Sequence, residues 1–203
     1  MLGVRAGWPW AGAAEAALIG EAFPDELVVC RYPNARAFVR MFHHPYYEWI
    51  NRRFRKGSGI RRFEFGFVQP TLFEVPKGRH PVASRSLVLR FNPAASEQAD
   101  AVLQRARALG AHGVYSGAQV ADVTAFIRGA FDADDPNPMP LQQLMILRCE
   151  SATHARQIAA DSALREALTH GGSPASAIVY RRNTLTDMGP GKPVPRVRLD
   201  ALV

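Results

Sequence analysis

Two stretches of the chain contain the same succession of features, and this repetition is the strongest constraint on the fold. Each begins with a short apolar run, continues with a helix-capping residue and an interrupted amphipathic helix, and ends with a second apolar run. The first occupies residues 27–67 and the second occupies residues 144–182. Because few letters are shared, the order of the features is the evidence for a repeat. We therefore expect a fold built from two similar halves.

The first stretch predicts a strand, a broken helix and a second strand. Leu27–Tyr32 is apolar and β-branched, as is typical of a buried strand. Asn34 follows at a helix N-cap position, where its side chain accepts a backbone N–H. His44-Pro45 interrupts the helix, because the residue before a proline avoids the α region. In Arg62–Phe67, phenylalanines alternate with other residues, which predicts a strand.

The second stretch predicts the same elements when Arg31 is placed on Arg148. In chain order these are a strand, an N-cap, a helix break and a closing strand, at Leu144–Arg148, Ser151, Asp161-Ser162 and Ala177–Tyr180. Upstream, Gly12-Ala13 matches Gly117-Ala118, and Trp10 matches Tyr115. Propensity alone favours a helix for the alanine-rich run after Gly12. The match to the copy predicts an extended segment instead.

A strand over Ser86–Phe91 and an amphipathic helix over Ala99–Leu109 precede the second stretch. Residues 85–182 thus read β-α-β-β-α-β, the ferredoxin-like arrangement. We predict an α+β protein of two ferredoxin-like repeats packed as an intrachain α+β barrel. The expected divisions are an incomplete repeat (1–70), a linker (71–84), a complete repeat (85–182) and a basic tail rich in proline and glycine (183–203).

The first repeat is expected to lack its opening strand and helix, so that Met1 is not the start of a complete domain. The copy has both elements before Gly117, whereas the stretch before Gly12 is too short for them. Three explanations remain open: a mis-assigned start codon, a degenerate gene, or a strand supplied by a partner or by the C-terminal tail. In the tail, Val197–Val203 is the spare extended candidate.

Charge and cysteine content narrow the classes of protein. The formal net charge is +7 and the pI is about 10.0, which permits contact with polyanions. Many of the basic residues lie in Arg52–Arg62, and an arginine-rich solvated surface is the favoured interpretation because no nucleic-acid motif accompanies them. Two cysteines, Cys30 and Cys149, favour reduced thiols over a disulfide framework. With no signal peptide and no long apolar run in this sequence, a cytoplasmic location and no membrane partner are expected.

Candidate chemistry is sparse. His43-His44 is a conspicuous pair, but neighbouring residues at a helix end point in different directions and lack a third ligand, so polar residues at a helix break are the better interpretation. The acidic loop around Asp132–Asn137 lacks the glycine and the closing glutamate of an EF-hand. We expect no metal, no haem and no other cofactor. Arg31, Arg90 and Arg148 end three predicted strands, and Arg90 and Arg148 are expected at opposite ends of the sheet.

The run Val29–Phe38, with Met41 and Pro45-Tyr46-Tyr47 after it, resembles the uncharacterised bacterial family called domain of unknown function thirteen-thirty. The resemblance is closer over residues 7–65 than over 85–182. It implies the dimeric α+β barrel superfamily, in which ferredoxin-like sheets pack face to face, and implies no particular reaction. The family often has His-Arg where this chain has Arg53-Phe54.

The leading functional hypothesis is a barrel that binds a small organic ligand between sheet and helices, with or without catalysis. The predicted ligand-binding residues are Trp10, Arg31, Tyr32, His43, His44, Tyr46, Tyr47 and Arg148, with Trp8 and Trp49 as further aromatic lining. The alternative is a basic module that contacts a polyanion through Arg52–Arg62. Nucleic acid is the weaker candidate among partners, and a homodimer or a structural role remains open.

Overall fold

The computed structural model describes residues 7–20, 26–32, 34–50, 66–74, 83–92, 96–122, 142–169 and 174–182. In this part of the chain there are seven strands and five helices: β1 Gly7–Ile19, β2 Glu26–Arg31, α1 Ala35–Phe42, α2 Pro45–Ile50, β3 Gly66–Phe73, β4 Arg85–Phe91, α3 Ser96–Ala108, β5 His112–Asp122, β6 Gln143–Cys149, α4 Ala152–Ala160, α5 Ser162–Thr169 and β7 Ser176–Arg182. The strands form one sheet in the order β2-β1-β7-β4-β6-β5-β3. Every neighbouring pair is antiparallel. The predicted α+β class is therefore confirmed.

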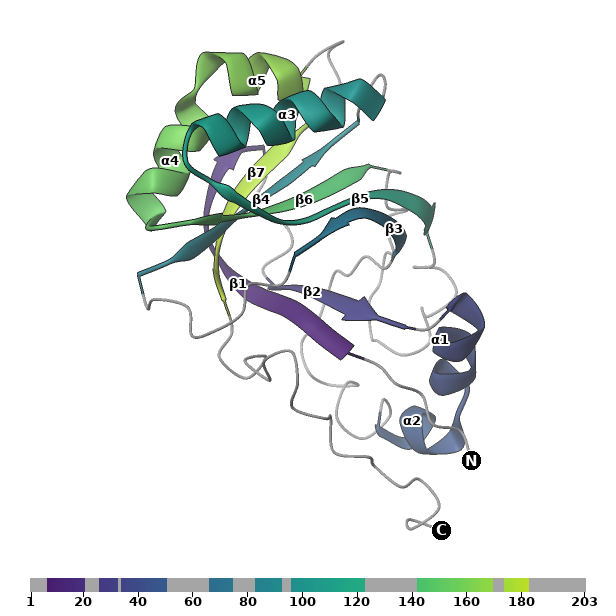
Figure 1. The fold of residues 1–203 in the computed structure, drawn as a ribbon. Coiled ribbons are helices and arrows are strands. Elements are labelled where there is room, and N and C mark those ends of the chain that lie inside the picture. Colours follow the sequence, from purple (N-terminus) through teal and green to yellow (C-terminus); the bar gives the residue numbers. More distant parts are fainter. Residues whose placement is uncertain are drawn as a thin grey trace.

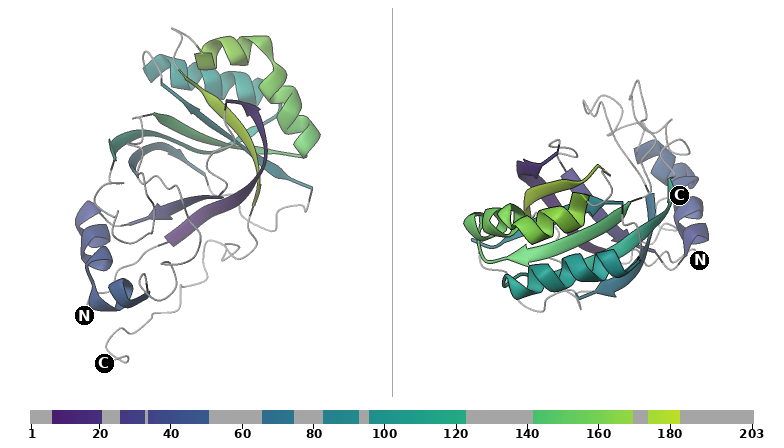
Figure 2. Two further views of the ribbon diagram at one scale, coloured as in Figure 1. Left: turned by 180° about the vertical axis from the view of Figure 1, so that it is seen from behind. Right: turned by 90° about the horizontal axis from the view of Figure 1, so that it is seen from above.

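The sheet is strongly curled, and its two faces are covered differently. Helices α3, α4 and α5 pack on the outer face, while α1 and α2 lie apart from them near the ends of β1 and β2 (Figures 1 and 2). Val29 of β2 and Val68 of β3, from the two end strands, pack against the same group of inner-face side chains. The end strands therefore curl towards the inner face and make it concave.

Strand β4 shows how the sequence distinguishes the two faces. Leu87, Leu89 and Phe91 point to the outer face and belong to the core under the helices. Val88 points to the inner face, as do Ser86 and Arg90 by alternation. All six of these residues are buried. A strand buried on both faces explains the nearly continuous apolar run in this part of the sequence.

The alanine-rich run after Gly12 is a strand, as the repeat argument predicted. It lies between β2 and β7 and pairs with both. Alanine has the highest intrinsic helix propensity, but that preference is weak beside two ladders of backbone hydrogen bonds. Tertiary pairing therefore decides the structure of Gly7–Ile19.

Both predicted helix caps and both predicted helix breaks are present. The Oδ1 of Asn34 accepts from the Ala37 N–H at 2.9 Å, and the Oγ of Ser151 accepts from the His154 N–H at 3.1 Å. The first helical region stops at Phe42 and resumes at Pro45, and the second stops at Ala160 and resumes at Ser162. Local capping chemistry thus determines these boundaries.

Two hairpins in the sheet share one pairing register. In β1–β2, Trp10 pairs with Val29 and Gly12 with Leu27. In β5–β6, Tyr115 pairs with Ile146 and Gly117 with Leu144. The outer pairs Gly7–Arg31 and His112–Arg148 correspond in the same way, and an irregularity follows each of them. Each residue of one hairpin therefore has a counterpart at the position that the sequence comparison assigns to it.

Strand β3 differs from its prediction. It continues through Phe73, into the stretch predicted as a linker from residue 71. It does so because β5 is its one described neighbour, and an end strand tolerates Pro70, which has no N–H to donate. Arg62–Phe65, the basic stretch Arg52–Arg62, the acidic loop Asp132–Asn137 and the tail 183–203 lie outside the described residues.

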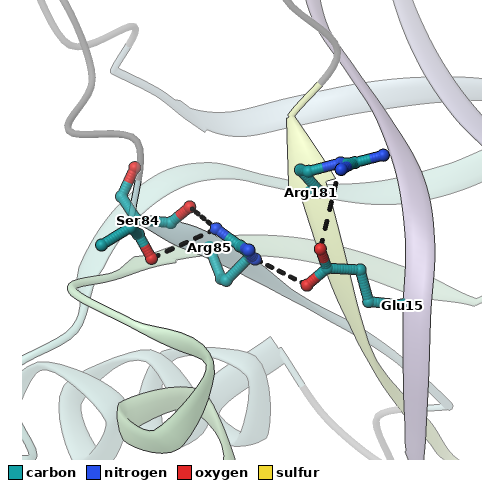
Figure 3. A network of polar contacts seen from close by, with 5 residues as sticks. Glu15, Ser84, Arg85 and Arg181 are labelled. Atoms are coloured by element: carbon teal, nitrogen blue, oxygen red, sulfur yellow. Dashed lines mark hydrogen bonds and ion pairs between the residues drawn. The ribbon is translucent and has the colours of Figure 1, made fainter.

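A polar network ties β1 to the strands of the central sheet. Glu15 is the extra residue at a bulge in β1, between the pairs Ala14–Tyr180 and Ala16–Val179. Its carboxylate accepts from Arg85 Nε at 2.5 Å and lies 3.9 Å from Arg181 Nε (Figure 3). Arg85 also donates to the Ser84 carbonyl at 3.1 Å. The bulge places one carboxylate between cations from β4 and β7, which favours this alignment of the three strands.

The break between α4 and α5 gives a pH-dependent prediction. Arg105 donates to both Asp161 carboxylate oxygens, at 2.9 and 2.6 Å, and the Leu164 N–H donates to Oδ1 at 2.9 Å. These hydrogen bonds, those from Arg105 first, lower the pKa of Asp161 to about 2. A depressed carboxylate pKa adds stability above the unfolded-state pKa of about 4, and the contribution is lost as the pH falls towards 2.

We therefore expect Asp161→Asn to lower the midpoint of thermal unfolding at pH 7, with a difference that shrinks as the pH falls from 4 towards 2. Asp100→Asn, on the exposed side of α3, is the matched control and should leave the midpoint close to that of the parent. A deficit in Asp161→Asn that stays constant across this pH range would contradict the assignment.

Candidate functional site

Aromatic and polar side chains gather at one end of the inner face. Trp10, 4% exposed, donates from Nε1 to Ser86 Oγ at 3.2 Å. Its ring meets the Tyr180 ring edge-on, with centroids 5.8 Å apart. Gly12 makes this arrangement possible, because a Cβ at that position would come within 2.8 Å of the Trp10 ring. The indole therefore lies directly over the backbone of β1.

Polar side chains also gather at the other end of the inner face. Arg90 is 8% exposed and pairs through its backbone with Leu144 and Ser176. Asn92 follows β4 two residues later, and its Oδ1 is buried with no hydrogen-bond partner among the described residues. On β5, Gln119 is 7% exposed. Its Nε2 is also buried with no hydrogen-bond partner among the described residues. Among the described residues, one buried donor and one buried acceptor thus lack partners at the end of the inner face that also holds Arg90.

The strand registers place these two amides in one neighbourhood. Phe91 pairs with Gln143, so Asn92 continues towards Gln142. The Gln119 N–H donates to the Gln142 carbonyl at 2.9 Å. Strand β6 therefore separates the two residues, and two strand spacings amount to about 10 Å between their backbones. The Gln119 amide lies over Gly66 of β3, where a Cβ would clash with its Nε2, so a ligand that reaches both amides has to extend across β5 and β6.

Apolar side chains join the two polar ends. Val88, Ile146 and Ile178 occupy the middle of the inner face, each no more than 2% exposed. Tyr115 lies beside them, and its burial raises its pKa to about 12. This part of the molecule is poorly solvated, so polar contacts made there are stronger than at the surface.

Of the predicted aromatic residues, Tyr32 and Tyr47 belong to a separate cluster around α1. The rings of Tyr32 and Phe67 each meet the ring of Phe38 edge-on at 5.3 Å. Tyr32 donates its hydroxyl to Met41 Sδ at 3.4 Å. Tyr47 packs near Phe42, with ring centroids 5.5 Å apart. These contacts hold α1 between the end of β2 and the start of β3.

The histidine pair lies at the break between α1 and α2. His43 is exposed at the C-cap of α1, and the Nδ1 of His44 accepts from the Tyr46 N–H at 3.2 Å. His44 therefore helps to start α2, beside the stacked rings of Tyr46 and Trp49. In the described part of the chain, no group of three or more histidines, cysteines and carboxylates could hold a metal ion.

The arginines at strand ends do not form one cluster. Ser86 pairs with Arg148 and Leu144 pairs with Arg90, which confirms that Arg90 and Arg148 lie at opposite ends of the sheet. Arg148 is half-buried in the same cross-strand row as Ser86 and Tyr180. Arg31 ends β2, and three strands lie between β2 and β6 in the sheet order. The structure brings Trp10 and Arg148 to one end of the inner face, while Tyr32 packs with α1.

A shallow cleft also lies at the C-terminal end of α3. Its lining includes Glu74, Arg107 and His112, all exposed. Because each of these side chains is already well solvated, this cleft offers less to a ligand than the buried groups of the inner face. No helix in the described residues is long and apolar enough to cross a membrane.

Sequence reasoning missed Asn92 and Gln119 and used Arg90 only as a strand end. A usable signal was present in β4, where Ser86, Val88 and Arg90 alternate with three large apolar residues. Alternate residues of a strand point to the same face. Two polar residues at alternate positions of an otherwise apolar strand therefore indicate a face with buried polar groups. Gln119 carried no comparable signal, because the turn and bulge pattern of β5 had to be known first.

Comparison with protein-family models finds no match to this chain, and comparisons with curated proteins and with solved structures find none either. The resemblance to the family described above therefore stays a prediction. The inner face is the part of the molecule that indicates a function.

Replacement of Gln119 gives a stability test of this site. We expect Gln119→Leu to raise the free energy of unfolding by about 1 kcal/mol, because it removes a buried donor that lacks a partner. Gln143→Leu is the matched control: Gln143 is also buried, but its Nε2 donates to Ser116 Oγ at 2.8 Å. Its replacement should lower the free energy of unfolding by roughly 1–2 kcal/mol. Urea denaturation measures both, and destabilisation by Gln119→Leu equal to that by Gln143→Leu would contradict the assignment.

Proposed function

We propose that this protein is an intrachain α+β barrel that binds a small organic ligand on the inner face of its curled sheet. The element order from β4 to β7 and the strand order β7-β4-β6-β5 support a ferredoxin-like unit over residues 85–182. The shared register of the hairpins β1–β2 and β5–β6 supports an incomplete second unit at the N-terminus. The proposed site is the concave face that the two units enclose.

The unsatisfied pair of amides carries the proposal. Gln119 Nε2 and Asn92 Oδ1 are buried without hydrogen-bond partners among the described residues. Leaving such a group unpaired costs about 1–3 kcal/mol, so a ligand that satisfies both gains that free energy on binding. The ligand must offer an acceptor to Gln119 and a donor to Asn92. Arg90 is buried at the same end of the inner face.

These requirements define a ligand class. A carboxylate accepts from Gln119, a neighbouring hydroxyl or amine donates to Asn92, and an apolar body packs on the half-buried Val68, which pairs with Gln119. A small aromatic or branched 2-hydroxy or 2-amino carboxylate meets all three conditions. Unlike the prediction of a ligand between sheet and helices, this proposal leaves the apolar core under α3, α4 and α5 intact.

Mandelate is a suitable probe because it carries a phenyl ring, a carboxylate and a hydroxyl. At about ten times its dissociation constant, a single-site ligand stabilises the folded state by about 1.4 kcal/mol. For a chain of this size we therefore expect mandelate to raise the unfolding midpoint by roughly 3 °C. Phenylacetate, which lacks the hydroxyl, and 1-phenyl-1,2-ethanediol, which lacks the carboxylate, should raise it less.

The binding test compares three proteins by calorimetric titration. Parent protein and Gln157→Leu, a change on the exposed side of α4, should bind mandelate equally. Gln119→Leu should bind it about tenfold more weakly, which corresponds to the loss of one hydrogen bond to a charged group. Equal affinity in Gln119→Leu, or equal stabilisation by all three probes, would contradict the proposed site.

A further inference from the structure

Arg148 of β6 lies at the end of the inner face that is opposite to the two amides. It points to the inner face because the residues on either side of it, Leu147 and Cys149, belong to the core under the helices. Its side chain is half-buried. In the described part of the chain, no ion pair or hydrogen bond joins its guanidinium to another residue. A guanidinium that is partly removed from water and has no partner is well suited to bind an anion.

Arg148 has a hydrogen-bond donor on each side of it in the sheet. Ser86 of β4 pairs with Arg148 on one side, and His112 of β5 pairs with it on the other. Directly opposed residues on antiparallel strands point to the same face and have Cβ atoms about 4.5–5.5 Å apart. Three adjacent strands therefore place a hydroxyl, a guanidinium and an imidazole side by side, and we call these three residues the Arg148 row.

Trp10 determines what Ser86 offers to a ligand. An indole N–H can only donate, so the serine oxygen accepts in the contact of 3.2 Å between Trp10 Nε1 and Ser86 Oγ. The hydroxyl proton of Ser86 is left to donate, and no described residue accepts it. Because Ser86 is buried, an acceptor that reaches this proton gains more than it would at the surface.

The Arg148 row contains donors without an anion to match them. A guanidinium has donors only, and an imidazole has at least one ring N–H in both its neutral and its charged form. Glu150, the nearest carboxylate along the chain, lies beyond the end of β6 and forms no ion pair with Arg148. Glu15 is already engaged by Arg85 and Arg181. Among the described residues, the row therefore lacks a negatively charged partner.

We propose that the Arg148 row binds the phosphoryl group of a small molecule. Donors from three strands match a group with three terminal oxygens. A carboxylate has only two oxygens, and the fork of one arginine can engage both of them.

The phosphoryl site is separate from the site proposed at Gln119. The N–H of Gln119 donates to the carbonyl of Gln142, just before β6 begins. From Gln142 to Arg148 the chain runs about 20 Å, at roughly 3.4 Å per residue. A ligand of the size of mandelate cannot reach both ends, so the inference does not rest on the ligand proposed above.

Phenyl phosphate tests the Arg148 row in the full-length protein by calorimetric titration at pH 7. The parent and Arg156→Gln, a change on the exposed side of α4, should bind it with equal affinity. Arg148→Gln should bind it at least about tenfold more weakly, because hydrogen bonds between two charged groups are lost. Arg148→Lys keeps the charge but not the planar fork, so it should bind about threefold more weakly and decides the test if Arg148→Gln does not fold. Gln119→Leu should bind as the parent does, which separates this site from the other one.

The indole signal of Trp10 in a proton NMR spectrum reports on the same event. When Ser86 donates to a phosphoryl oxygen, its own oxygen becomes a stronger acceptor, and the hydrogen bond from Trp10 Nε1 strengthens. We expect the indole N–H signal to move downfield as phenyl phosphate is added, with the dissociation constant that calorimetry gives. The loss of this signal in Trp10→Phe assigns it. An indole signal that does not move while phenyl phosphate binds would contradict the role of Ser86.

A second probe and the arginine control complete the test. Benzoate has the same ring and only two oxygens, so it should bind at least about tenfold more weakly than phenyl phosphate. Equal affinity for both probes would overturn the phosphoryl assignment, as would equal affinity in the parent and either Arg148 variant. Equal weakening by Arg148→Gln and Arg156→Gln would also overturn it, because the anion would then be responding to the net charge of +7 and not to a site.

Discussion

The pairing of β1 with β7 is the interaction on which the rest of this structure depends. It joins a hairpin from the N-terminal part of the chain to a sheet formed by the C-terminal part, over six residue pairs from Gly12–Arg182 to Ile19–Ala177. The bulge within that pairing turns Glu15 towards Arg85 and Arg181. It also carries Trp10 over the inner face, where the indole reaches Ser86. Without the pairing of β1 with β7, the sheet would not curl and Trp10 would not lie beside Ser86 on the inner face.

The two faces of the sheet have different physical roles. The outer face of the central strands is apolar and covered by α3, α4 and α5, so it supplies most of the hydrophobic stabilisation. The inner face combines an apolar middle with Arg90 and two amides, each of which has one buried atom without a hydrogen-bond partner among the described residues. Stability alone would favour apolar residues at those amide positions. Polar side chains in a buried position conflict with the demands of stability, and such local conflicts are expected at functional sites.

Much of the local structure could be predicted from the sequence, because caps and breakers act over a few residues. Asn34 and Ser151 cap their helices, Pro45 restarts one of them, and the repeat identified Gly7–Ile19 as a strand against its helix propensity. Pairing between distant strands was not predictable in this way. That β3 joins β5, and that Tyr32 packs on α1 instead of beside Trp10, depend on contacts between residues far apart in the sequence. The amides of the candidate site required both the face of β4 and the bulge of β5 to be known.

The interleaved sheet order has a consequence for how the molecule folds. Strands from residues 7–73 occupy both ends of the sheet, and those from residues 85–182 occupy its centre. The central part can assemble early from contacts within residues 83–182, whereas β1 and β3 find their partners β7 and β5 only after that surface has formed. The N-terminal half is therefore a dependent structure, templated by sequence that a ribosome makes after it. During synthesis it must wait for its partners, which makes it the part most exposed to chaperones and to mispairing.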